Sequence, residues 1–263
     1  MTMQTKVAVV TGSGGRGCGR AIALRFAREG AAVMVSDIEQ GGGEETLQLL
    51  RAAGARAAFC RADVGSEDQV RALFAYTETE LGGVDVLVNN ASAPFAPGGP
   101  MTEWLNPITV DLLGALYTTR FAVDAMRRRG GGAIVNMSST SALSHGRQRP
   151  QGVAYDVAKA GLLRLTTALA SLAQTDNIRV NCLVPDWIAT PEVKAYFDQL
   201  PPEQKNRDGI PAALTSLEEV TDAVVTLAVS PTLAGRALVI WSGGLRGLIP
   251  FGDPGYTALE PEE

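Results

Sequence analysis

The sequence has few metal-binding side chains, with one histidine and three cysteines among 263 residues. Structural zinc sites need Cys and His ligands at short, regular spacing. Cys18, Cys60 and Cys182 are odd in number and far apart, no CxxC pair occurs, and His145 stands alone. This pattern supports neither a zinc site nor a disulfide framework, and it is typical of a reducing compartment.

A surplus of positive charge is also lacking. The chain has 23 Lys and Arg against 28 Asp and Glu, a net charge of −5. Because nucleic acids and anionic membranes attract basic surfaces, we expect neither as a partner. No apolar run reaches the roughly 18 residues of a membrane-spanning helix, and residues 1–5 do not resemble a secretory signal. We therefore expect a soluble, cytoplasmic protein.

Short apolar segments alternate with helical patterns along the chain, and the hydrophobic content of 46 % is enough for one substantial core. Strands are expected at 6–11, 32–37, 56–60, 84–88, 133–137, 178–184 and 236–240. Helices are expected at 20–29, 44–53, 67–82, 104–129 with a bend near Pro107, 155–174 and after the cap 216–219; the sequence 66–69 reads as a capping box. The alternation predicts an α/β fold, a Rossmann-type doubly wound parallel sheet in a single domain over 1–263.

A glycine-rich turn follows the first predicted strand. Gly12, Gly17 and Gly19 lie between that strand and the first helix. Glycines let a pyrophosphate approach the backbone closely, and the N–H groups at a helix start bind the anion. The sequence therefore predicts a dinucleotide site at this turn.

The residue that ends the second strand, Asp37, bears on the choice of cofactor. A carboxylate there can accept hydrogen bonds from the adenosine ribose and would repel the 2′-phosphate of NADP. Arg16, inside the turn, could instead pair with that phosphate or face solvent. Because a carboxylate facing a phosphate is costly and an idle arginine is not, NAD is favoured over NADP.

Tyr155 and Lys159 are four residues apart at the start of a predicted helix. Residues at this spacing share one face, so the phenol and the ammonium can point into the same cleft. A free tyrosine, with a pKa of ~10, is a poor base near neutrality, and a nearby cation favours its phenolate. The pair alone is weak evidence, since two solvated side chains on a helix surface have the same spacing.

Polar residues follow almost every predicted strand. In parallel sheets, ligands bind beyond the carboxyl ends of the strands. The residues at these ends are Asp37, Asp63, Asn89, Asn90, Ser138, Ser139 and the segment 185–190, together with the glycine turn. Their convergence predicts one site along this edge of the sheet.

On these motifs, residues 7–244 resemble a short-chain dehydrogenase/reductase with chains of about this length. The resemblance implies that Tyr155 is the general acid/base, that Lys159 lowers its pKa and holds the nicotinamide ribose, and that Ser139 binds the reacting oxygen, with Ser138 as the alternative. The dinucleotide would also contact residues along the whole edge, assigned by position as Gly12, Gly17, Gly19, Asp63, Val64, Asn89, Ala91, Pro185, Ile188 and Thr190.

The sequence departs from the family pattern at several positions. Asp111 stands where the family usually has Asn. Either its carboxylate competes for the charge of Lys159, for which we place it in the catalytic set, or it is a solvated or helix-bonded substitution without effect on the mechanism. Ser92 replaces the last glycine of the usual Asn-Asn-Ala-Gly, and the glycine turn is one residue longer. Asp186 replaces a glycine after Pro185 and either contacts substrate or faces solvent.

Three further segments match variable parts of the family. The loop 141–152 is longer than usual, and its His145, Arg147 and Arg149 either recognise an anionic substrate or are solvated. The segment 190–213 matches a substrate lid, with an apolar face made by Tyr196, Phe197 and Leu200. Residues 245–263 would form a C-terminal arm or a frayed end.

The resemblance implies an NAD-dependent oxidoreductase that interconverts a secondary alcohol and a ketone, assembled as a homotetramer. Two alternatives stay open. The same site could perform non-redox or epimerase chemistry, or the protein could bind a dinucleotide without turnover.

Overall fold

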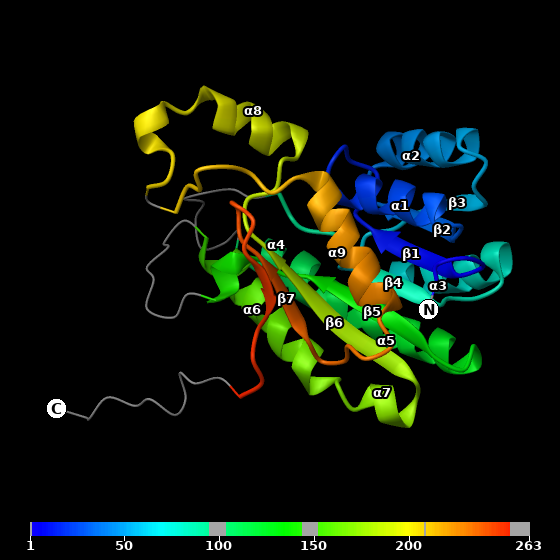
Figure 1. The fold of residues 1–263 in the computed structure, drawn as a ribbon. Helices are drawn as coiled ribbons and strands as arrows, with labels where there is room; N and C mark the ends of the chain where they lie inside the picture. The colour runs from blue at the N-terminus through cyan, green and yellow to red at the C-terminus, as the bar shows by residue number, and fades with distance from the viewer. Residues whose placement is uncertain (1, 95–103, 144–151, 208, 253–263) are drawn as a thin grey trace.

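A computed structural model of the chain describes residues 2–94, 104–143, 152–207 and 209–252 (Figure 1). The strands are β1 (Val7–Thr11), β2 (Ala32–Asp37), β3 (Ala57–Arg61), β4 (Val86–Asn89), β5 (Gly132–Met137), β6 (Ile178–Pro185), β7 (Ala237–Ile240) and β8 (Arg246–Leu248). The helices are α1 (Cys18–Arg28), α2 (Gln40–Ala52), α3 (Glu67–Leu81), α4 (Leu105–Pro107), the π-helix η2 (Ile108–Leu113), α5 (Gly114–Arg128), the 3₁₀-helices η3 (Thr140–Leu143) and η4 (Pro202–Gln204), α6 (Val153–Ala168), α7 (Leu172–Thr175), α8 (Pro191–Gln199) and α9 (Leu217–Val229).

The strands form one sheet in the order β3-β2-β1-β4-β5-β6-β7-β8. All neighbouring pairs from β3 to β7 are parallel, so all these strands end at the same edge. The order reverses at β1 and β4, which is where ligands bind in doubly wound sheets. The predicted α/β, doubly wound, single-domain fold is confirmed.

The last strand, β8, pairs with β7 in the antiparallel sense and was not predicted. It is only three residues long, and all three are exposed. A short exposed strand has no continuous apolar pattern that would identify it in a sequence. The predicted C-terminal arm begins in this hairpin, and its residues 253–263 lie outside the described part of the chain.

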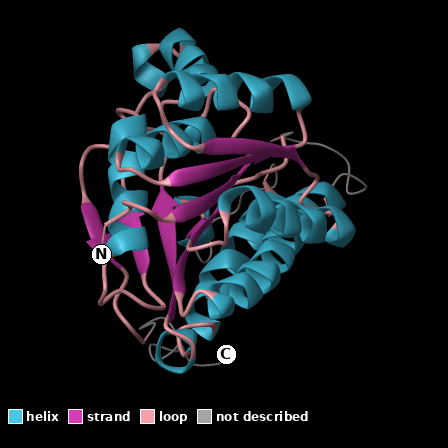
Figure 2. Cartoon of the chain, turned by 90° about the vertical axis from the view of Figure 1, so that its right-hand side faces the viewer, coloured by secondary structure: helices cyan, strands magenta, loops and turns pink. Residues whose placement is uncertain are grey.

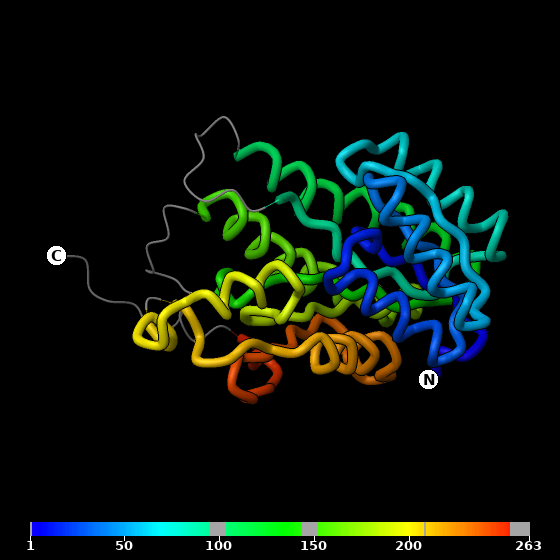
Figure 3. Tube along the Cα trace, turned by 90° about the horizontal axis from the view of Figure 1, so that it is seen from above, coloured from blue at the N-terminus to red at the C-terminus, as the bar shows by residue number. Residues whose placement is uncertain are grey.

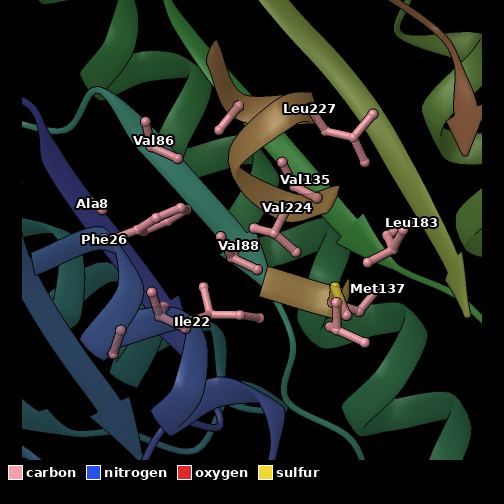
Figure 4. Close-up of a cluster of buried hydrophobic side chains, with 14 of the residues drawn as sticks. Ala8, Ile22, Phe26, Val86, Val88, Val135, Met137, Leu183, Val224 and Leu227 are labelled. Carbon is pink, nitrogen blue, oxygen red and sulfur yellow. The ribbon is translucent and has the colours of Figure 1, made fainter. Parts of the chain in front are cut away.

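Two hydrophobic layers enclose the sheet, as Figure 2 shows for the helices on its two faces. Alternate residues of β1 supply each layer: Ala8 and Val10 join one buried cluster, and Val7 and Val9 join the other. Helices α1 and α9 cover the first face, where their apolar side chains meet β1, β4, β5 and β6 (Figure 4). Helices α3 and α5 cover the second face.

Two of the sequence expectations about helix ends differ from the structure, and a third is confirmed. The predicted capping box at 66–69 is wrong: Ser66 makes no side-chain cap, and Gln69 instead accepts the N–H of Asp63 at 2.9 Å. The second predicted cap is confirmed as a complete capping box, because Ser216 and Glu219 exchange both bonds. The helix expected at 155–174 ends at Ala168 and resumes as α7.

The helical stretch after Trp104 is continuous through Pro107, and its irregularity is the π-helical segment η2. Such segments widen a helix by one residue per turn and are frequent at functional sites. In the described residues, no helix is both long and apolar enough to cross a membrane.

Candidate active site

Two glycines of the turn after β1 are required by close packing. Gly12 has φ of +64°, and a Cβ there would lie 2.7 Å from the Ala91 Cα. A Cβ at Gly19 would lie 2.1 Å from the Gly12 carbonyl oxygen. Gly17, the residue before α1, has only the Thr190 methyl group near this position, at 3.6 Å. The turn is thus compact at its base and borders the segment after β6 at its tip.

The ends of β1 and β4 are tied together by hydrogen bonds. The Thr11 hydroxyl accepts the backbone N–H groups of Asn90 and Ala91, each at 3.1 Å. The Asn90 side chain donates to the carbonyl oxygens of Thr11 and Gly12 at 2.9 and 3.0 Å. These bonds fix the two loops at the switch point of the sheet, so the Asn90 amide acts as a structural clamp.

Hydrogen bonds from Arg20 of α1 and Thr46 of α2 also hold the glycine turn, and no sequence motif predicted them. Arg20 is 8 % exposed and donates to the Gly14 carbonyl at 2.7 Å and to the Thr46 hydroxyl at 2.9 Å. Thr46 in turn donates to the Ser13 carbonyl at 2.9 Å. Because these partners are far apart in the chain, only the fold brings them together.

Asp37 lies at the end of β2, against the glycine turn, as predicted. Its carboxylate accepts the N–H of Gly14 at 2.7 Å and that of Glu39 at 3.0 Å. Arg16 is exposed on the same turn. The pKa of Glu45 is held below its ordinary value, first by the hydrogen bond from Arg20 and less by the charge of Arg16. Arg16 therefore lies near a carboxylate of this chain.

The first turn of α1 carries no negative charge that would oppose an anion. It has no acidic residue. Burial raises the pKa of the Cys18 thiol to about 11, so the thiol is neutral at physiological pH. The helix start therefore retains its partial positive charge for a ligand.

The residues expected at the adenosine end lie at the strand ends but use their side chains within the protein. Asp63 accepts the Gly65 N–H at 2.8 Å. Val64 is 7 % exposed and packs against Gly114. Asn89 is 5 % exposed and bonds Asn136 and both neighbouring threonines of α5. Their roles in nucleotide binding stay predictions.

The two serines after β5 have different surroundings. Ser138 is 4 % exposed, and its hydroxyl donates to the Lys159 carbonyl at 2.8 Å. Ser139 is half-buried, and its hydroxyl accepts the Ser141 N–H at 3.2 Å. A hydroxyl that accepts can still donate its own proton. This geometry favours Ser139 over Ser138 as the residue that meets a ligand.

Tyr155 and Lys159 come together on the first turns of α6, which packs against η3. The Lys159 ammonium lies 5.3 Å from the Tyr155 ring centroid and donates to the Met137 carbonyl at 3.1 Å. Burial lowers the pKa of Lys159, but the charges of Tyr155 and Asp111 outweigh it, so the pKa lies above its ordinary value. Lys159 is therefore cationic at physiological pH.

Asp111 also reaches this cluster, from η2. Its carboxylate lies 3.1 Å from the Lys159 ammonium, and both side chains are almost fully buried. The expectation that this carboxylate lies beside the lysine is met by the geometry.

The segment after β6 lies at the other end of the site. Pro185 ends the strand, and Ile188 is held by a parallel bridge to Thr215. Thr190 caps α8 by accepting the Val193 N–H at 3.4 Å. Asp186 is half-buried, and its carboxylate accepts from the Thr140 hydroxyl at 3.2 Å and the Ser242 N–H at 3.3 Å, so it does not simply face solvent; its contact with a substrate stays a prediction.

The lid segment has a smaller apolar face than expected. Tyr196 is 53 % exposed and pairs with Trp187, with ring centroids 6.1 Å apart. Phe197 is 9 % exposed and lies under the Lys205 ammonium, so its ring points away from solvent. Figures 1 and 3 show α8, in yellow, projecting from the body of the molecule.

A buried polar chain that the sequence did not reveal connects the helices around the site. The Asn89 amide donates to the Asn136 side chain at 2.9 Å, and the Asn136 amide donates to the Thr166 hydroxyl at 2.9 Å. The chain runs from α5 through β4 and β5 to α6. It holds the helix of Tyr155 and Lys159 against the sheet.

Some predicted features fall outside this site. His145, Arg147 and Arg149 lie outside the described residues. Among the residues that the structure does describe, no group of three or more His, Cys, Asp or Glu side chains is placed to hold a metal ion.

Comparison with known proteins gives matches over most of the chain. A family model described as short chain dehydrogenase matches residues 6–201. An uncharacterized oxidoreductase of Thermotoga maritima is 39 % identical over 195 residues, 73 % of this chain and 75 % of that protein. Cis-4-hydroxycyclohexanecarboxylate dehydrogenase of Sinomonas cyclohexanicum is 34 % identical over 261 residues, 97 % of each chain. The solved structure of 7α-hydroxysteroid dehydrogenase, complexed with NADH and 7-oxo glycochenodeoxycholic acid, has a TM-score of 0.79 at 27 % identity, covering 94 % and 97 % of the two chains.

Proposed function

The chain belongs to the short-chain dehydrogenase family of oxidoreductases, and on that premise we propose that it interconverts a secondary alcohol and a ketone with NAD as cofactor. The observation that carries the proposal is the pairing of Tyr155 with the buried ammonium of Lys159, 5.3 Å from its ring, at the carboxyl edge of the sheet.

The residues present fit a dinucleotide. Gly12 and Gly19 hold the turn in a shape that a Cβ would disrupt, and Gly15 has no atom within 4 Å of its Cβ position. The start of α1 offers backbone N–H groups for a pyrophosphate. Asp37 supports NAD over NADP, because its carboxylate lies against the turn and would repel a 2′-phosphate.

The protein groups supply proton transfer and orientation. The Ser139 hydroxyl donates a hydrogen bond to the reacting oxygen, and Tyr155 takes the alcohol proton during oxidation or returns it during reduction. The Lys159 cation stabilises the phenolate electrostatically and binds the nicotinamide ribose. When bound, the nicotinamide accepts or donates the hydride.

The substrate class that we propose is an alicyclic secondary alcohol. The relative from Sinomonas acts on a hydroxycyclohexane carboxylate, and the solved neighbour is a hydroxysteroid dehydrogenase. The half-buried Trp187, just before the segment 190–213, and the 53 % exposed Tyr196 within it form an aromatic pair that gives this segment an apolar surface suited to a saturated ring. We propose that this segment closes over the substrate as a lid.

We also propose a cytoplasmic homotetramer. Its support is the exposed apolar side chains on the helical segments beside the site, Leu105, Leu116 and Val157, which are 72 %, 41 % and 54 % exposed. Size-exclusion chromatography with light scattering tests this assembly.

The catalytic proposal is tested with a panel of open-chain and alicyclic secondary alcohols, each with NAD or NADP, by following the absorbance of the reduced dinucleotide. Turnover of one or more alcohols with NAD is expected. Tyr155→Phe should lower kcat/KM by about 10²- to 10⁴-fold, whereas Tyr76→Phe, at a 40 % exposed position on α3, should not. Dinucleotide binding without turnover of any alcohol would favour the non-catalytic alternative.

A further inference from the structure

The carboxylate of Asp111 is the most deeply buried charge near the site. Its side chain has no exposed surface, and its Oδ2 lies 3.1 Å from the Lys159 ammonium. It also accepts the Ser92 hydroxyl at 2.5 Å and the Ala93 N–H at 2.7 Å. One cation and two hydrogen-bond donors thus offset the cost of burying this carboxylate.

Asp111 and Ser92 are two positions at which the sequence departs from the family pattern, and the structure places them in contact. A serine hydroxyl can donate to a carboxylate, whereas the usual glycine has no side chain to do so. Asp111 is the buried residue of the π-helical segment η2 and contacts both Ser92 and Lys159 of α6. The two departures therefore form one unit, a carboxylate with its own hydroxyl donor.

The charge of Lys159 is consequently shared. An ammonium has three N–H donors, and here one is directed at Asp111 and one at the Met137 carbonyl. The negative charge of Asp111, 3.1 Å from the ammonium, opposes the positive charge of Lys159, so the electrostatic support that Lys159 gives to a phenolate is partly cancelled.

We propose that Asp111 is a positioning residue that holds Lys159 by a direct ion pair and shifts the ionisation of Tyr155 to higher pH. The inference rests on the proposed function for its meaning in catalysis, since it concerns the same site. It implies an enzyme whose alcohol oxidation continues to rise at a pH where an Asn-containing site would have reached its plateau.

The other groups that face Lys159 do not explain such a shift. On α6 the neighbouring titratable groups are Tyr155 itself and the half-buried Asp156, which is not among the groups that shift the pKa of Lys159. Strand β5 contributes the Met137 carbonyl and Ser138. From β6, Cys182 is near, but burial raises the pKa of its thiol to about 12, so it carries no charge. Among these contacts of the described residues, Asp111 is the negatively charged group that directly contacts Lys159 and can thereby change the ionisation of Tyr155.

The decisive variant is Asp111→Asn, which removes the charge and nearly preserves the shape. The direct readout is the ionisation of Tyr155, followed as the tyrosinate absorbance that disappears in the matching Tyr155→Phe protein. We expect Asp111→Asn to move this titration to lower pH by about one unit and the acid limb of kcat/KM for oxidation by the same amount. Asp68→Asn, which removes a carboxylate whose side chain is 87 % exposed on α3, should change neither.

A second variant gives a shift of opposite sign. Ser92→Ala removes the hydroxyl donor from an exposed position and leaves the Asp111 charge in place. The carboxylate then depends more on Lys159, so the Tyr155 titration should move to higher pH. If Asp111→Asn does not fold, Ser92→Ala decides alone, and an unchanged titration overturns the proposal.

The absorbance titration needs no substrate, which separates this inference from the proposed function. An active enzyme whose Tyr155 titration and pH profile are the same in the wild type and in Asp111→Asn overturns the inference alone. A protein that oxidises no alcohol, but whose Tyr155 absorbance titration moves to lower pH in Asp111→Asn and to higher pH in Ser92→Ala, overturns the proposed function alone.

Discussion

The neighbouring serines after β5 provide a prediction that follows directly from their different environments. We expect Ser139→Ala to abolish most activity with little effect on stability. We expect Ser138→Ala to lower stability with little effect on activity. Ser139 is half-buried and its proton is available to a ligand. Ser138 is 4 % exposed and its hydroxyl is committed to the Lys159 carbonyl.

The magnitudes follow from these contacts. Loss of a donor to a developing oxyanion costs about 10²- to 10³-fold in kcat, which we expect for Ser139→Ala. The Ser138 hydrogen bond of 2.8 Å is buried, so its loss should lower the free energy of unfolding by about 1–2 kcal/mol. For a chain of this size that corresponds to roughly 2–8 °C in Tm. Well below the Tm, Ser138→Ala should keep activity within about tenfold of the wild type.

The assay combines thermal unfolding with steady-state kinetics on an alcohol found in the substrate panel. Both variants are measured with saturating NAD, so that differences in cofactor affinity do not enter. Inactivation by Ser138→Ala at an unchanged Tm, with full activity in Ser139→Ala, would refute the assignment of the two hydroxyls.

Other predictions test the cofactor site and a helix cap. Gly19→Ala should abolish dinucleotide binding in titration calorimetry, because its Cβ would lie 2.1 Å from a backbone oxygen, whereas Gly15→Ala, with no atom within 4 Å, should bind normally. Asp37→Ala should change the ratio of kcat/KM for NAD and NADP by about tenfold or more towards NADP, and an unchanged ratio would contradict its role. Glu219→Ala should lower the free energy of unfolding at pH 7 by about 0.5–1 kcal/mol. The Ser216 N–H and hydroxyl hold the pKa of Glu219 below its ordinary value of 4.5, so the loss, measured by denaturant unfolding, should be present above that pH and vanish as pH falls below it.

The architecture was predictable because it depends on local patterns. The run 7–10 is apolar on both faces, which is typical of a buried parallel strand, and the structure places the fully buried β1 there. The antiparallel β8 was not predictable, because three exposed residues carry no periodic signal. The capping box at 66–69 was a false match, since Gln69 is taken by a neighbouring backbone group.

The site was predictable where the residues form a motif and not where they meet only through the fold. Tyr155 and Lys159 are one helical turn apart, so their contact follows from the sequence. Arg20 and Thr46 are separated by a helix and a strand, and their bond depends on how α2 packs on the glycine turn. The sequence predicted that Asp111 lies near Lys159, and the structure shows an ion pair between them. The hydrogen bond from the Ser92 hydroxyl to Asp111 was not predicted.

The buried chain from Asn89 through Asn136 to Thr166 has a mechanical consequence. An apolar interface would let α6 rotate or slide on the sheet by small steps at little cost, since many aliphatic packings are nearly equivalent. A polar chain permits only one alignment, because a slip of one helical turn, about 5.4 Å, would strand the Asn136 amide without an acceptor at a cost of about 1–3 kcal/mol. The position of the phenol and the ammonium relative to the strand ends is therefore set by the bond between Asn136 and Thr166, about three helical turns after Tyr155 and about two after Lys159.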